Sequence, residues 1–158
     1  MSVLRTGSLR ASLPWLAMAL ISLPGIGASS YLTYSHYVDE PTVCAGIGSC
    51  EFVQTSEYSA IVGVPVAVMG LAYFVALALL ASARLLGVAW ALDWGTPAVH
   101  AMAIGGTLFV GYLTAIELFV LDAICVWCVA VATMTAISLV LAIWARFAER
   151  DEEALEAL

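Results

Sequence analysis

Four long apolar stretches constrain this chain of 158 residues more than any other feature of its sequence. A helix that crosses a bilayer needs about 20 mostly apolar residues, because the hydrocarbon core is about 30 Å thick. The composition agrees, since only 11% of the residues are charged, against roughly 25% in soluble domains. We therefore predict an all-α integral membrane protein, a single domain over residues 1–158 built as a bundle of four transmembrane helices. The predicted spans run from about Leu13 to Tyr34, Ile61 to Ala83, Pro97 to Leu121 and Ala123 to Ala145.

The positive charges predict how the four spans are oriented. All five are arginines, and they lie before the first span, after the second and after the fourth: Arg5, Arg10, Arg84, Arg146 and Arg150. With four spans these places are on one side of the membrane, which the positive-inside rule makes cytoplasmic. Both termini are then cytoplasmic, and the loop of about residues 36–60 lies outside. The net charge of −7 argues against a basic surface for nucleic acid.

Two local signals bear on where helices begin. Thr96 followed by Pro97 is typical of a helix start, with the threonine as N-cap and the proline in the first turn. Asp122 is placed to cap the fourth helix in the same way. At the N-terminus, arginines and an apolar run resemble a cleavable signal peptide. That run continues to Tyr34, longer than the 7–15 residues usual for a signal core, which favours a retained span.

Four cysteines carry the predicted chemistry. Cys44 and Cys50 lie in the outer loop, while Cys125 and Cys128 form a C-x-x-C at the predicted start of the fourth helix. Residues at i and i+3 share a helix face, and a helix N-terminus favours a reactive thiolate. Static disulfides and a tetrahedral zinc site remain alternatives. We favour redox chemistry, in which two dithiols pass a disulfide between them by thiolate exchange and a quinone in the apolar bundle accepts the electrons.

In sequence order these residues resemble the vitamin K epoxide reductase family. The resemblance spans most of the chain and rests on Cys44-x5-Cys50, Ser56, Gly63-Val64-Pro65 and Cys125-Val-Trp-Cys128. Quinone-coupled disulfide generators of the DsbB type also have four spans and two cysteine pairs. Their C-x-x-C lies in the first external loop, however, whereas here it comes last, and this order favours the vitamin K epoxide reductase type.

The resemblance implies a relay of electrons. Cys128 would face the quinone, Cys125 and Cys50 would form the disulfide between the two pairs, and Cys44 would complete the pair that accepts electrons from a partner. Ser56 would lie near the quinone head group. The implied protein is a bacterial inner-membrane oxidase that uses menaquinone or ubiquinone and reoxidises a DsbA-like, thioredoxin-fold protein. Since the chain stops at Leu158 after a short acidic tail, we expect no fused thioredoxin-like domain and a separate partner.

Two positions depart from the human-type enzyme. An asparagine near the start of its second span corresponds here to Ser59, and a tyrosine one turn after its C-x-x-C corresponds to Ala132. Both family residues help to hold the oxygens of the quinone or epoxide, so the departures count against epoxide reduction. Ser59 remains a candidate for binding the quinone.

Other polar and aromatic residues have competing interpretations. Glu117 either reaches the lipid head groups from the end of the third span or carries protons for quinone reduction. Trp127 is predicted to join an interfacial aromatic belt with Tyr31, Tyr34 and Tyr37, and it is also a candidate to shield the quinone. His36 is either a proton relay or an ordinary interfacial histidine. The loop acids are either solvated charge or an attraction for a basic partner: Asp39, Glu40, Glu51 and Glu57.

Overall fold

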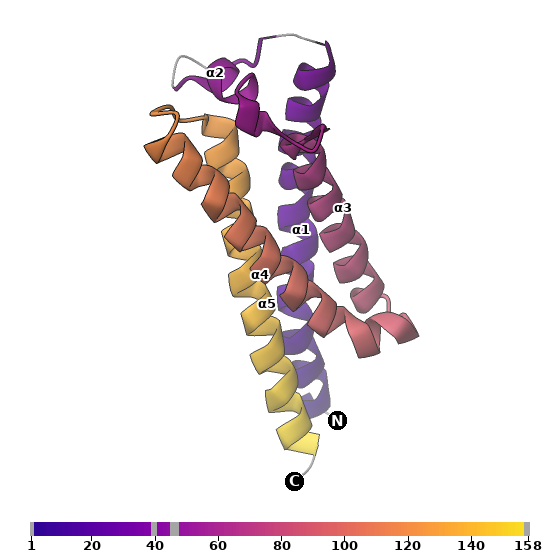
Figure 1. Cartoon of the computed structure of the whole chain (residues 1–158). Coiled ribbons are helices and arrows are strands. Elements are labelled where there is room, and N and C mark those ends of the chain that lie inside the picture. The colour runs from indigo at the N-terminus through magenta and orange to yellow at the C-terminus, as the bar shows by residue number, and fades with distance from the viewer. Residues whose placement is uncertain (1, 39–40, 45–47, 157–158) are drawn as a thin grey trace.

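Four long helices make up most of the computed structural model, which describes residues 2–38, 41–44 and 48–156 (Figure 1). They are α1 (Ser2–Val38), α3 (Val66–Leu85), α4 (Ala89–Phe119) and α5 (Val126–Glu156). Each contains a segment long and apolar enough to cross a membrane, so the prediction of an all-α four-helix membrane protein is confirmed. The two termini lie at the end of the bundle opposite the short helix α2 (Cys50–Gln54) (Figure 1).

The core of the bundle draws two residues from each long helix. α1 packs mainly against α3 and α5, and α4 packs mainly against α5. Half of the residues in the shared cluster are alanines. Small side chains let membrane helices approach closely, and the resulting van der Waals contacts stabilise helix packing where no hydrophobic effect operates between helices. The buried residues of this cluster are Trp15, Met18, Leu77, Ala81, Val99, Ala103, Ala142 and Ala145.

The second span begins at Val66 instead of Ile61. Strands β1 (Ala60–Ile61) and β2 (Val64–Pro65) pair antiparallel just before it. Both residues of the connecting turn, Val62 and Gly63, have positive φ angles, as a two-residue hairpin turn of type I′ requires. The apolar residues between 61 and 65 therefore form a hairpin and not the first turn of the helix. Their backbone groups are paired between the two short strands.

The third span begins at Ala89, and the predicted helix start at Thr96 and Pro97 is wrong. Both residues lie inside α4, which neighbouring helices in a membrane bundle allow for proline. The Thr96 hydroxyl donates instead to the carboxylate of Glu149 on α5, at 2.9 and 3.0 Å. Arg84 donates to the same carboxylate at 2.7 Å. The threonine has a tertiary partner that the local sequence does not show.

The fourth span begins at Val126, and the predicted cap at Asp122 is also wrong. Asp122 has a φ of 49°, a left-handed conformation outside the helix. The carbonyl of Cys125 accepts the first helical hydrogen bond, from the Val129 N–H at 3.0 Å, so Cys125 occupies the capping position. α5 then continues to Glu156, well past the apolar stretch that predicted an end near residue 145.

Candidate functional site: four cysteines beside an apolar cavity

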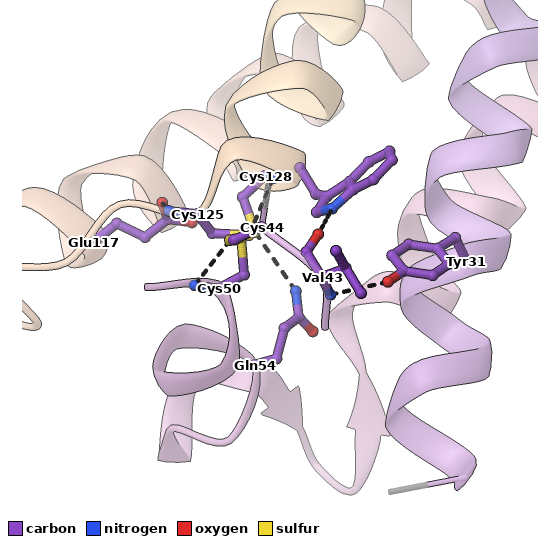
Figure 2. Close-up of a disulfide and its surroundings, with 9 residues drawn as sticks. Tyr31, Val43, Cys44, Cys50, Gln54, Glu117, Cys125 and Cys128 are labelled. Atoms are coloured by element: carbon purple, nitrogen blue, oxygen red, sulfur yellow. Dashed lines mark hydrogen bonds between the residues drawn. A yellow bond between two sulfur atoms is a disulfide. The ribbon is translucent and has the colours of Figure 1, made fainter. Parts of the chain in front are cut away.

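All four cysteines gather at the end of the bundle that carries α2 (Figure 2). Cys44 and Cys50 form a disulfide with a Cα–Cα distance of 5.9 Å, and the Cys50 N–H lies 3.2 Å from the Cys44 sulfur. Cys125 and Cys128 are free thiols. Cys50 and Cys125 are fully buried in one cluster, and Cys44 and Cys128 pack against it. The structure therefore brings the two predicted pairs into one group.

The disulfide joins a different pair from the one that the resemblance implies. The expected bond between Cys50 and Cys125 is not formed, since Cys50 is bonded to Cys44 within the loop. Helix α2 begins at Cys50 and points its side chain inward, where it lies in the same buried cluster as Cys125. Because thiolate exchange needs only contact between a free thiol and a disulfide sulfur, the arrangement suits transfer between these two residues.

Cys125 is an ionisable thiol at the N-terminus of α5. Its sulfur accepts the Cys128 N–H at 3.4 Å, the bond that a capping residue makes to the third residue of a helix. A hydrogen bond from the Cys128 side chain is the main reason that the pKa of Cys125 falls from its ordinary value of 9.0 to about 7. Burial opposes this lowering. This lowering favours the Cys125 thiolate, which is the form of a cysteine that attacks a disulfide.

Glu117 is turned inward, so its predicted contact with lipid head groups is wrong. Its side chain is only 5% exposed, and a carboxylate oxygen accepts the Cys125 N–H at 3.2 Å (Figure 2). The carboxyl group also interacts electrostatically with the Cys128 thiol. Ala123 donates its N–H to the Glu117 carbonyl at 3.0 Å, which ties the turn before α5 back onto α4. The acid is thus held beside both thiols.

An apolar cavity of about 300 Å³ lies beside Cys128, between the long helices. Side chains such as Leu32, Phe109 and Leu113 line it, and Ala132 and three glycines leave it open. The predicted residues Ser56, Ser59 and Glu117 also line it. An apolar cavity with a few polar groups at one end fits a ring-shaped, lipid-soluble ligand such as a quinone.

The model of the vitamin K epoxide reductase family matches residues 16–143, which is most of the chain. The chain belongs to this family. Family membership makes it a helical, multi-pass membrane protein with thiol oxidoreductase activity, and the disulfide between Cys44 and Cys50 accords with that activity. Within residues 2–38, 41–44 and 48–156, no group of three or more His, Cys, Asp or Glu side chains is placed to hold a metal ion.

Trp127 lies within the C-x-x-C, directly before Cys128, but it is not among the residues that line the cavity. Its ring packs on Tyr31 with centroids 5.0 Å apart, and its indole N–H donates to the Val43 carbonyl at 2.9 Å. The Val43 N–H in turn donates to the Tyr31 hydroxyl at 3.0 Å (Figure 2). Trp127 therefore fastens the loop next to Cys44 to α1 and α5, and its role in shielding a quinone stays a prediction.

Two functional candidates were missed from the sequence. Gln54 lies one turn after Cys50 on α2, and its amide nitrogen is 3.6 Å from the Cys128 sulfur (Figure 2). That spacing on a cysteine-bearing helix was the available signal. Tyr73 also lines the cavity, and its hydroxyl reaches Ser138 on α5 at 2.5 Å. Neither its sequence neighbours nor its position within an apolar span distinguished it.

Proposed function

We propose that this protein is a quinone-coupled thiol oxidase that reoxidises a thioredoxin-fold protein outside the cytoplasm. The observation that carries the proposal is the position of Cys128. It lines the apolar cavity and forms a C-x-x-C with Cys125, which shares a buried cluster with the loop residue Cys50. Cys128 thus borders a candidate site for a lipid-soluble electron acceptor, while Cys125 lies next to a cysteine of the loop.

The relay has three balanced exchanges. The dithiol of the partner reduces the Cys44–Cys50 disulfide and becomes a disulfide itself. The two loop thiols then reduce a disulfide between Cys125 and Cys128, which restores the loop disulfide. The Cys125–Cys128 dithiol is finally oxidised by a bound quinone, which accepts two electrons and two protons. The loop disulfide and free C-x-x-C thiols are the state expected between the second exchange and the third.

Glu117 is the proposed proton carrier of this relay. It is buried, lines the cavity and lies beside both C-x-x-C thiols. In a site of low dielectric constant a carboxyl group can accept a thiol proton as the electrons leave and pass it onward. Ser56 and Ser59 supply hydroxyl groups at the same end of the cavity. The Ser59 hydroxyl is the proposed donor to the oxygens of the quinone ring, and the Ser56 hydroxyl, which donates to the Val53 carbonyl at 2.7 Å, is a proposed acceptor from the quinol.

The proposed location is the inner membrane of a bacterium, with the cysteine end outside the cytoplasm. Arg84 lies in the last turn of α3, and Arg146 and Arg150 lie far along α5, toward the end of the bundle that holds both termini (Figure 1). The positive-inside rule assigns that end to the cytoplasm. The opposite compartment is oxidising and allows disulfides to persist.

The partner would meet the loop that carries Cys44. Glu51 and Glu57 are exposed on this side, and a partner with a basic surface around its own cysteines would be attracted to them. Asp39 and Glu40, which the sequence adds to this acidic group, lie outside the residues that the structure describes.

The test is quinone reduction by the purified protein with a reduced thioredoxin-fold donor, followed by ultraviolet absorbance. Cys128→Ala should abolish quinone reduction. Cys44→Ala should block turnover with the protein donor while a small dithiol, which can reduce the C-x-x-C directly, still supports it. Normal quinone reduction by the Cys128→Ala variant would contradict the proposal. Inertness of every cysteine to mild reductant would favour static disulfides instead.

A further inference from the structure

A second cavity, of about 330 Å³, lies on the loop side of the apolar one. All of the residues that line it except Pro41 have polar side chains, and two of these are titratable, His36 from α1 and Glu51 from α2. Gln54 and Ser59 line both cavities. These two residues, here called the partition, are thus the ones that border both the outer polar cavity and the inner apolar cavity.

The proposed reaction needs a proton route as well as an electron route. Reduction of a quinone to a quinol takes up two electrons and two protons. Oxidation of the Cys125–Cys128 dithiol to a disulfide releases two electrons, but it releases only one proton when Cys125 starts as the thiolate. With a pKa of about 7, Cys125 is about half ionised at neutral pH. The missing proton then has to reach the inner cavity from water.

One residue of the partition lies beside the Cys128 sulfur, and the other has an uncommitted hydroxyl group. The Gln54 amide nitrogen lies 3.6 Å from the Cys128 sulfur. The Ser59 hydroxyl makes no hydrogen bond within the part of the chain that the structure describes, so it is available to water or to a ligand. By contrast, the Ser56 hydroxyl is committed to the Val53 carbonyl at 2.7 Å. Ser59 can thus donate to one cavity while accepting from the other.

Two threonine hydroxyls around the inner cavity are already committed to backbone acceptors, while the buried Ser29 hydroxyl, which lines this cavity and not the outer one, has no hydrogen-bond partner among the described residues. Thr114 donates to the Val110 carbonyl and Thr135 to the Val131 carbonyl, each at 2.8 Å. Both are hydrogen-bonded along their own membrane-spanning helices. Neither threonine lines the outer cavity. A proton that arrives by these residues would have to cross the apolar bundle.

On the basis of the proposed function, we infer that the Gln54–Ser59 partition is the proton entry of the reaction cavity. The outer cavity holds water, with His36 and Glu51 as its titratable groups, and Ser59 passes protons inward to Glu117 and the quinone oxygens. Gln54 holds the Cys128 sulfur against this entry. Electrons thus reach the quinone through the cysteines, and the compensating proton reaches it through the adjacent Gln54–Ser59 partition.

The first test needs no quinone. In a Cys125→Ser background with the loop disulfide intact, Cys128 is the only thiol of the chain, since the sequence has four cysteines. Exchange of its S–H for S–D after transfer into D₂O is followed by infrared spectroscopy. Gln54→Met together with Ser59→Ala should slow this exchange roughly tenfold, because water no longer meets a polar partition. Thr114→Val, which removes a hydroxyl from the inner cavity alone, is the matched control and should leave it unchanged.

The second test measures turnover with a soluble quinone analogue. The double variant should lower kcat roughly tenfold, increase the solvent deuterium isotope effect on kcat and regain activity when a small weak acid is added. An increase in KM with unchanged kcat would overturn the inference, since the two residues would then only bind the ring. Unchanged S–H exchange would overturn it as well.

The two tests separate this inference from the proposed function. If the wild-type protein reduces no quinone but its Cys128 exchange depends on the partition, the proposed function fails and the entry route stands. If the wild-type protein turns over and the double variant matches it in both assays, the entry route fails and the proposed function stands.

Discussion

Replacing Cys128 by alanine should raise the pKa of Cys125 from about 7 toward its ordinary value of 9.0, because the Cys128 side chain is the largest cause of the lowering. One pKa unit corresponds to ~1.4 kcal/mol, so the site stabilises the Cys125 thiolate over the thiol by ~3 kcal/mol. Loss of most of this stabilisation would reduce the thiolate fraction at neutral pH from about half to a few per cent.

The assay is a pH titration of thiolate absorbance in the ultraviolet. With the Cys44–Cys50 disulfide intact, Cys125 is the only thiol in the Cys128→Ala variant, so its midpoint is read directly. Cys128→Ser keeps a hydroxyl donor at the same position and is the control, with a midpoint expected close to 7. A midpoint near 7 in Cys128→Ala would refute the reasoning, because the lowering would then come from the helix terminus alone.

Two further predictions concern stability in detergent, measured by thermal unfolding. Gly25→Ala should destabilise the bundle by ~1–3 kcal/mol, because the added Cβ would lie 2.5 Å from the Phe74 ring. Gly27→Ala is the control and should leave the stability unchanged, because a Cβ there would have no neighbour within 4 Å. Because the pKa of Cys125 is lower in the folded chain (about 7) than its ordinary value (9.0), its stabilising contribution should be absent below pH 7 and grow between pH 7 and 9. Cys125→Ser should lack this rise, and an equal rise in that variant would assign it to another group.

The membrane class, the number of spans and the cysteine pattern could be predicted because each depends on sequence-local properties. Apolar length decides whether a helix can cross a bilayer, and the order of the two cysteine pairs along the chain is visible directly. Helix starts were harder to predict, because Thr96 and Asp122 have the chemistry of capping residues. Thr96 instead donates to Glu149, which is distant in sequence, and Asp122 lies in a left-handed turn.

The residues that surround the thiols could not be predicted from the sequence. Glu117 lies near the end of its span, where a long side chain could turn toward either lipid or protein. Its inward position depends on the turn before α5, which presents the Cys125 N–H as a buried donor. Gln54 similarly gains its place beside Cys128 from the fold of α2 over the bundle. The candidate quinone contacts Ser56 and Ser59 lie at the cavity, and their binding role stays a prediction.

The fastening of Val43 bears on how a partner can reach the disulfide. Both main-chain groups of this residue are held, its N–H by Tyr31 and its carbonyl by Trp127, and Cys44 follows it directly. This attachment restrains Cys44 from moving outward. The reacting sulfur of a partner protein must therefore approach Cys44 where it lies. The shape of the partner's surface around that sulfur, more than any flexibility of this chain, would determine which proteins can be oxidised.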